Sequence, residues 1–202
     1  MAFNIDTFKS QGLALGGARP SLFRVRLFFP AVIAGKSAAE QESVFHVRAG
    51  QMPASTLGTV EVPYFGRKIK LAGDRTFTDW TVTIMNDEDF LLRNALEEWS
   101  NAINTLVSNR LNPAVAGNIA GTTGNYKTDL FVDQYAKDGP SDEQGIIRSY
   151  RFVGAFPTEI GTINLDWDTT NQIETFDTTF AYDYWVPEPV NTPAYSPILN
   201  PA

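Results

Sequence analysis

Hydrophobic residues alternate and then recur at helical spacing between Pro63 and Trp99, the stretch around which the chain is organised. The pattern favours a strand over 67–71, a turn at Ala72-Gly73-Asp74 and a second strand over 78–85. The large apolar residues that share one face of the second strand are Trp80, Val82 and Ile84. This part of the chain therefore predicts two strands that precede a helix.

The predicted helix runs from about 87 to 108, with Asn86 as its N-cap. Its first turn carries Asp87, Glu88 and Asp89, where the helix dipole favours negative charge. One apolar stripe follows the helical period through Leu92, Leu96, Trp99, Ile103 and Leu106. No other stretch predicts a long helix, so the remaining chain should form the sheet on which this helix packs.

Shorter alternating runs predict the rest of that sheet. The expected strands cover 22–29, 43–48, 129–135, 146–155, 162–165 and 172–185. Loops are expected at 31–42 and 111–126, and a long turn or an excursion beyond the sheet at 49–59. Phe156-Pro157 should end the strand before it. The chain shows no internal repeat. The fold class that follows is mainly β, an antiparallel β-sandwich or barrel flanked by one α-helix, with long loops.

The composition argues against several classes of function. A chain of 202 residues suits one ordered domain, and its net charge of −7 argues against a protein that grips nucleic acid. The absence of cysteine excludes disulfides and thiolate metal sites. The N-terminus lacks the pattern of a signal peptide, and no apolar run approaches the roughly 18 residues of a membrane span. We expect a soluble protein made in the cytosol.

Few residues in the sequence suggest a catalytic or metal-binding site. A pair of carboxylates across a cleft could cleave a glycosidic bond, and the candidates are Asp166, Asp168, Glu174, Asp177 and Asp183. The alternative is a polar hairpin at 168–171 and a solvated strand face at Asp177. Consecutive helix residues diverge, so Asp87 to Asp89 should not hold a metal. His46 is the single histidine and is expected to be structural. The sequence thus predicts no catalytic residue, no cofactor and no metal.

The aromatic and basic residues suggest packing and contacts between subunits. Trp80 and Trp99 are predicted to lie in the core, whereas Trp167 and Trp185 are candidate interface anchors or sugar-stacking platforms. The basic cluster comprises Arg67, Lys68, Lys70 and Arg75. These cations are better suited to ion pairs with a neighbouring acidic subunit than to a nucleic-acid site.

Two blocks of this sequence resemble the tail tube proteins of T4-like contractile-tailed bacteriophages. The first is RKIKLAGDRTFTDWTVTIMND, from Arg67 to Asp87. The second block comprises Asn164 to Asp168, Asn171 to Phe176 and Ala181 to Trp185. The resemblance covers a tube domain at 19–185. It leaves an N-terminal arm at 1–18, an added loop at 114–125 and a proline-rich C-terminal extension at 186–202.

The resemblance implies an assembly rather than an enzyme. Six copies would form a ring, and stacked rings would form a hollow tube whose inner barrel joins about 24 strands across subunits. The implied partners are further copies, the tail sheath, the baseplate, and the tape measure protein and genomic DNA in the lumen. The implied location is the virion tail, assembled in the host cytoplasm, with no membrane.

The resemblance also suggests which residues meet which neighbours. The candidate ring-stacking hairpin includes Gln51, Met52, Pro53, Pro63, Tyr64 and Phe65. Alternate polar positions that would face the lumen are Asp79, Thr81, Thr83, Thr175, Asp177 and Thr179. Two alternatives remain: a tube subunit or tube initiator of another contractile injection system, and a carbohydrate-binding β-sandwich that uses its exposed tryptophans.

Overall fold

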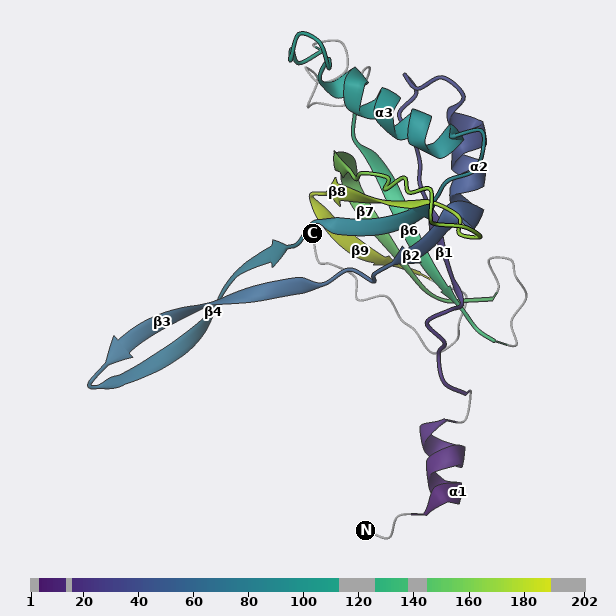
Figure 1. The fold of residues 1–202 in the computed structure, drawn as a ribbon. Helices are drawn as coiled ribbons and strands as arrows, with labels where there is room; N and C mark the ends of the chain where they lie inside the picture. Colours follow the sequence, from purple (N-terminus) through teal and green to yellow (C-terminus); the bar gives the residue numbers. More distant parts are fainter. Residues whose placement is uncertain (1–3, 14–15, 113–125, 138–144, 190–202) are drawn as a thin grey trace.

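The computed structural model describes residues 4–13, 16–112, 126–137 and 145–189 (Figure 1). Its strands are β1 (Phe23–Arg26), β2 (Val47–Gly50), β3 (Ser55–Tyr64), β4 (Arg67–Phe77), β5 (Trp80–Met85), β6 (Thr128–Tyr135), β7 (Ile146–Ile160), β8 (Thr175–Ala181) and β9 (Tyr184–Glu188). Its helical segments are α1 (Ile5–Thr7), the π-helical turn η1 (Phe8–Gly12), α2 (Lys36–His46) and α3 (Leu91–Ile103).

Seven antiparallel strands form the body of the molecule, and the predicted fold class is confirmed. Their order is β1-β6-β7-β8-β5-β2, with β9 added on β7. The long strand β7 belongs to two curved halves, because its first part pairs with β6 and β9 and its last part with β8. Helices α2 and α3 cover one end of this curved sheet (Figure 1).

The core lies between the two halves of the sheet and under α3. Trp80 and Trp99 are both buried in it, as predicted. The Trp80 ring stacks on Phe152 with 4.2 Å between ring centres. Trp99, from α3, contacts Phe29 and Phe180, and its indole nitrogen donates a 2.8 Å hydrogen bond to the Tyr126 carbonyl. Helix α3 is thus fixed to the sheet by its largest apolar side chain.

Helix α3 is shorter than the sequence predicts. It begins after Phe90, whose positive φ of 53° ends the preceding loop, and Asn86 is not its cap. The Asn86 amide instead donates a 2.7 Å hydrogen bond to the Glu174 carboxylate. Leu92, Leu96 and Trp99 are buried as the stripe requires, but Leu106 lies beyond the helix end and is exposed.

A second helix, α2, replaces residues 36–42 of the loop predicted at 31–42 and most of the strand predicted at 43–48. The short alternation around Val44 suggested a strand, but the run of good helix formers from Lys36 onward prevails. Ala39 and Ser43 lie one turn apart and are both buried. The Ser43 hydroxyl accepts a hydrogen bond from the Leu27 amide, which joins α2 to the end of β1.

Strands β3 and β4 form a long hairpin that extends away from the body (Figure 1). The turn predicted at Ala72-Gly73-Asp74 is wrong, because β4 runs through it without a break. The chain reverses at Phe65 and Gly66, whose φ angles of 44° and 78° are the positive values that a two-residue type I′ turn needs.

The C-terminal third also differs from its predicted strands. Strand β7 continues through Pro157 to Ile160, along an edge where a missing N–H is tolerated. The predicted strand at 172–185 is divided into β8 and β9, and no strand forms at 162–165. The predicted added loop at 114–125 lies outside the described residues. So does the extension beyond residue 189, although β9 carries the sheet to Glu188.

None of the helices in the described ranges combines the length and the apolar character that crossing a membrane demands.

Candidate assembly surfaces

A row of polar side chains crosses β5 and β8 on the face opposite the core. The hydroxyls of Thr81 and Thr179 lie 3.1 Å apart, and Thr83 donates a 2.6 Å hydrogen bond to Asp177. The alternate residues Val82 and Ile84 point the other way and are buried. We call Asp79, Thr81, Thr83, Thr175, Asp177 and Thr179 the polar ribbon.

The structure brings the six predicted lumen residues together on this ribbon. Thr81 and Asp177 are exposed, and Thr83, Thr175 and Thr179 are half-buried. Asp79 is exposed just before β5. Burial raises the pKa of the Tyr182 hydroxyl above its ordinary value of 10.0, and the negative charge of Asp79 adds to that rise. None of the six side chains lies in a dry core.

Two strand edges flank the polar ribbon. The half of the sheet that carries it has the order β2-β5-β8-β7, where only the last part of β7 takes part. Among the described residues, β2 pairs only with β5, and residues 156–160 of β7 pair only with β8. Each edge therefore offers backbone groups that another strand could pair with.

The β3–β4 hairpin carries large apolar side chains without a core beneath them. At least two-fifths of the side chain is exposed in Leu57, Val60, Val62, Tyr64, Phe65, Ile69 and Leu71. Of the predicted stacking residues, Pro63, Tyr64 and Phe65 lie at or beside the tip. Gln51, Met52 and Pro53 lie at the base, where the Gln51 carbonyl accepts a 2.7 Å hydrogen bond from the Trp80 indole.

The two hairpin strands approach closely at a pair of glycines. A Cβ atom on Gly73 would lie 3.1 Å from the Gly58 carbonyl carbon and oxygen, which is tighter than ordinary packing. The register shifts at the same place, between Leu57 and Thr59. Gly73 suggested a turn in the sequence. In the structure it lets the two strands approach and twist, and the chain does not reverse there.

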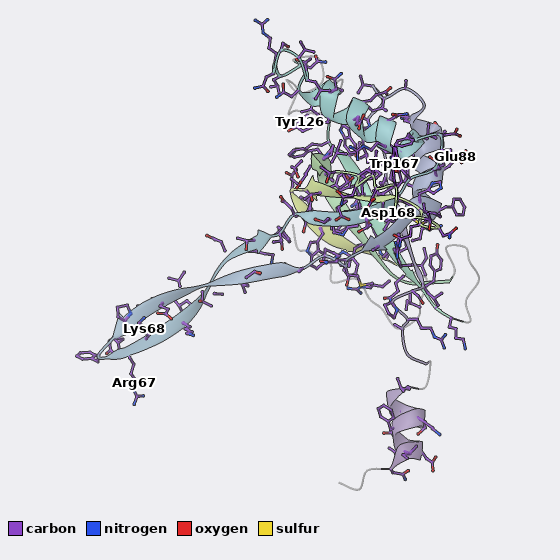
Figure 2. All side chains as sticks on the ribbon, viewed as in Figure 1. Arg67, Lys68, Glu88, Tyr126, Trp167 and Asp168 are labelled. Atoms are coloured by element: carbon purple, nitrogen blue, oxygen red, sulfur yellow. The ribbon has the colours of Figure 1, made fainter. Side chains whose placement is uncertain are left out.

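The basic cluster lies on β4, and Arg67 and Lys68 are close to the hairpin tip (Figure 2). Lys68 forms a 2.6 Å ion pair with Glu61 on β3, and Arg75 donates a 2.7 Å hydrogen bond to Ser55. These contacts connect the two arms of the hairpin. The proposed pairing of this cluster with a neighbouring subunit remains a prediction.

The two candidate interface anchors have different surroundings. Trp167 is fully exposed at 101% of its reference area, in the loop beside Asp168 (Figure 2). Trp185 is half-buried, contacts Phe77 and Tyr150, and donates a 3.2 Å hydrogen bond to the Ala54 carbonyl. Within the chain, Trp185 therefore joins the base of the hairpin to β9, while Trp167 is available to a partner.

Of the carboxylates considered for glycosidic cleavage, Asp166 and Glu174 line one pocket beside Trp167, whereas Asp177 and Asp183 have partners elsewhere. Asp177 is bonded to Thr83, and Asp183 forms a 2.7 Å ion pair with Lys127. Asp166 accepts a 3.0 Å hydrogen bond from the Asp168 amide, which makes a local turn. Sequence reasoning identified the polar turn and the solvated strand face, but it missed the ion pair of Asp183 and the length of the hairpin, for which Gly66 was the available signal.

Comparison with known proteins gives a consistent result. A family model described as "Phage tail tube protein" matches residues 18–188. The tail tube protein gp19 of Enterobacteria phage T4 is 36% identical over 168 residues, which are 83% of this chain and 90% of the phage protein.

Solved structures of two other proteins have a similar fold. One is the sheath/tube terminator of PVC, an extracellular contractile injection system: TM-score 0.57 and 16% identity, covering 86% of this chain and 97% of that one. Another is from the six-fold symmetrised baseplate of the anti-feeding prophage: TM-score 0.54 and 12% identity, covering 87% of this chain and 98% of that one.

Proposed function

The chain belongs to the family of phage tail tube proteins, and on that premise we propose that six copies form a ring whose stacked repeats make a hollow tube. Membership itself makes the chain a structural tail tube subunit of the virion, not an enzyme. What we propose beyond family membership is the six-fold ring, the stacking of rings and the position of the lumen.

The observation that carries the ring is the pair of open edges beside the polar ribbon. In a ring, β2 of one copy pairs with residues 156–160 of the next, and four strands from each of six copies close a barrel of about 24 strands. A barrel of that size leaves a wide aqueous channel. The polar ribbon then faces the channel, and the core face stays inside the subunit.

The hairpin supports stacking of one ring on the next. Its ten-residue strand β3 reaches about 33 Å at ~3.3 Å per residue. The exposed apolar side chains near the tip, among them Tyr64 and Phe65, lose their contact with water only when another subunit covers them. The net charge of −7 suits a wall along which DNA slides without binding.

Further partners follow from the same architecture. We propose that the sheath surrounds the α3 side of the ring, that a baseplate starts the tube, and that the tape measure protein and the genome occupy its lumen. The solved sheath/tube terminator and the baseplate protein share this fold, which supports the first two partners. A tube of another contractile injection system is the second candidate, but the 36% identity to the T4 protein favours the phage tail.

Negative-stain electron microscopy over a range of concentrations tests the assembly. We expect hollow tubes or stacked six-fold rings. Phe65→Asp at the hairpin tip should leave rings that do not stack, whereas Val107→Asp, at a fully exposed position beyond α3, should still form tubes. Monomers that persist after a baseplate preparation is added would contradict the proposal.

Cysteine labelling tests the lumen, because the chain has no cysteine of its own. In assembled tubes, Thr81→Cys should react with a small maleimide and resist one attached to a large polymer. Val107→Cys should react with both reagents. Equal reaction of Thr81→Cys with the large reagent would place the polar ribbon on the outer surface of the tube instead.

A further inference from the structure

Three side chains with metal-binding atoms converge between α2 and the loop after β5. Glu42 and His46 lie one helical turn apart on α2, and Asp87 follows β5. One potential ligand atom from each residue lies within 4.8 Å of the other two, and all three residues are half-buried. None of the three residues belongs to the polar ribbon or the hairpin, although His46 directly precedes β2.

Hydrogen bonds between these residues do not account for their arrangement, although Glu42 and His46 are within ion-pair distance when the imidazole is protonated. The His46 Nδ1 and Glu42 Oε2 atoms are 3.9 Å apart, which is too long for a hydrogen bond. Glu42 Oε2 is shielded from solvent and has no hydrogen-bond partner among the described residues. Tetrahedral zinc with bonds of about 2.1 Å separates two ligand atoms by ~3.4 Å, so a movement of about 0.5 Å would seat one ion between the two side chains.

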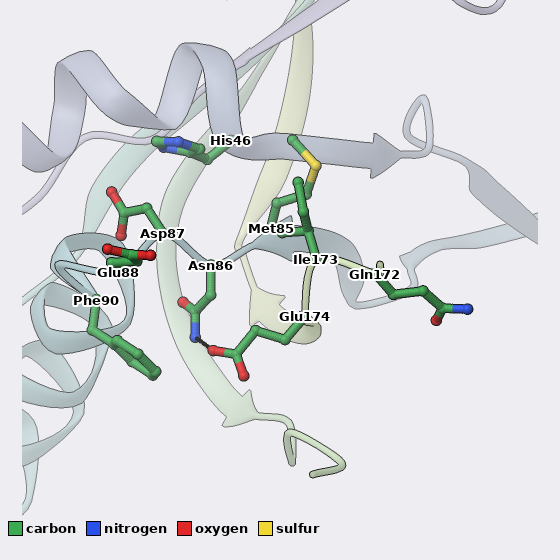
Figure 3. A pocket seen from close by; sticks show the side chains of 9 residues that line it. All are labelled: His46, Met85, Asn86, Asp87, Glu88, Phe90, Gln172, Ile173 and Glu174. Atoms are coloured by element: carbon green, nitrogen blue, oxygen red, sulfur yellow. Dashed lines mark hydrogen bonds between the residues drawn. The ribbon is translucent and has the colours of Figure 1, made fainter. Parts of the chain in front are cut away.

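The surroundings favour a cation. Nine residues line the adjoining pocket, and Figure 3 shows Asp87 and Glu88 beneath the His46 ring. Glu174 is a third carboxylate in this lining, which contains neither lysine nor arginine. Several negative groups without a cationic partner lower the electrostatic potential of the pocket, and a divalent ion offsets their mutual repulsion.

We propose that Glu42, His46 and Asp87 bind a divalent transition-metal ion of the Zn²⁺ type. One imidazole and two carboxylates suit Zn²⁺, whereas Mg²⁺ and Ca²⁺ prefer oxygen ligands alone. The bound ion ties α2 to the connection between β5 and α3, and it requires no assembly of the chain into rings.

Calorimetric titration of untagged protein with Zn²⁺ tests the site. We expect one ion per chain, a rise in melting temperature, and at least a tenfold loss of affinity in His46→Ala. Glu42→Gln keeps the side-chain shape and should also weaken binding. Asp89→Asn, in the same loop but outside the cluster, should bind as the unchanged protein does.

Because His46 is the only histidine, its imidazole NMR signals report this site alone. Saturating Zn²⁺ should shift them, and saturating Mg²⁺ should not. Circular dichroism of each variant shows whether it is folded. The proposal is wrong if folded His46→Ala binds Zn²⁺ unchanged, if the imidazole signals do not move, or if binding is not stoichiometric.

Discussion

The body and the β3–β4 hairpin contain similar apolar residues, which the body buries and the hairpin exposes. In the body, one face of each strand is buried, so alternation places Val82 and Ile84 in the core and threonines on the polar ribbon. In the hairpin, Val60 and Ile69 are about half exposed, because no second layer covers either face. The body stabilises itself by apolar burial, whereas the hairpin gains such burial only in the stacked rings that we propose.

The largest effect should come from the body core. Trp99→Ala removes a fully buried ring and its hydrogen bond to Tyr126, and we expect a loss of about 3–5 kcal/mol in the free energy of unfolding. Urea denaturation measures the loss. Val107→Ala, at a fully exposed position, should change stability by less than about 0.5 kcal/mol. Similar losses in the two variants would remove the distinction between core and surface.

A smaller effect should come from the buried charge of the body. Asp133 is fully buried and accepts hydrogen bonds from Arg24 at 3.0 Å and Ser149 at 2.6 Å, while Arg26 pairs with it at 3.0 Å. Asp133→Asn keeps the shape but leaves the two guanidinium groups without their anion. We expect a loss of about 2 kcal/mol in urea denaturation. No loss would mean that the buried ion pairs contribute nothing to stability.

A substitution inside the hairpin should lower the local stability of the hairpin and leave that of the body unchanged. Gly73→Val forces a side chain against the Gly58 backbone, so amide hydrogens of β3 and β4 should exchange faster while the melting temperature changes little. Ala72→Val, next in the chain and already carrying a Cβ, is the matched control. Hydrogen-exchange mass spectrometry compares hairpin and body peptides. Faster exchange throughout the body would show that the two regions unfold together.

The smallest effect lies where the two regions meet. Tyr182 contacts Phe77 at the end of β4, and its raised pKa means that folding favours the neutral hydroxyl. This contribution to stability is complete below pH 10.0, the ordinary pKa, and is lost as the pH rises through the higher folded-state pKa. Tyr182→Phe should therefore lose less stability above that pH, as alkaline urea denaturation can measure. Asp79→Asn should lower the Tyr182 pKa, and an unchanged tyrosinate titration would contradict the role of Asp79.

The sequence correctly predicted elements in which apolar residues recur at regular spacing on one face. Trp80 and Trp99 were placed in the core by alternation and by helical spacing, and both are there. Alternation also placed Thr83 and Asp177 away from the core. It could not pair them, because the register of β5 against β8 joins residues 94 apart and depends on the whole fold.

Other elements depend on choices that local patterns do not decide. The segment before His46 fits both a short strand and a helix, and burial of Ala39 and Ser43 under the fold selects α2. Glycine has two uses in the hairpin: Gly66 adopts positive φ at the turn, and Gly73 permits close backbone approach. The sequence shows a glycine at each position but not which use applies.

The order of the strands in the polar ribbon sets the timing of assembly during protein synthesis. The hairpin closes over neighbouring residues, so it can form as soon as β4 leaves the ribosome. Strand β5 must wait for β8, which ends at Ala181, and only then does the half-sheet between the two open edges exist. In the ring that we propose, a nascent chain thus lacks the surface for joining other copies until most of its residues have been translated, which would delay polymerisation on the ribosome.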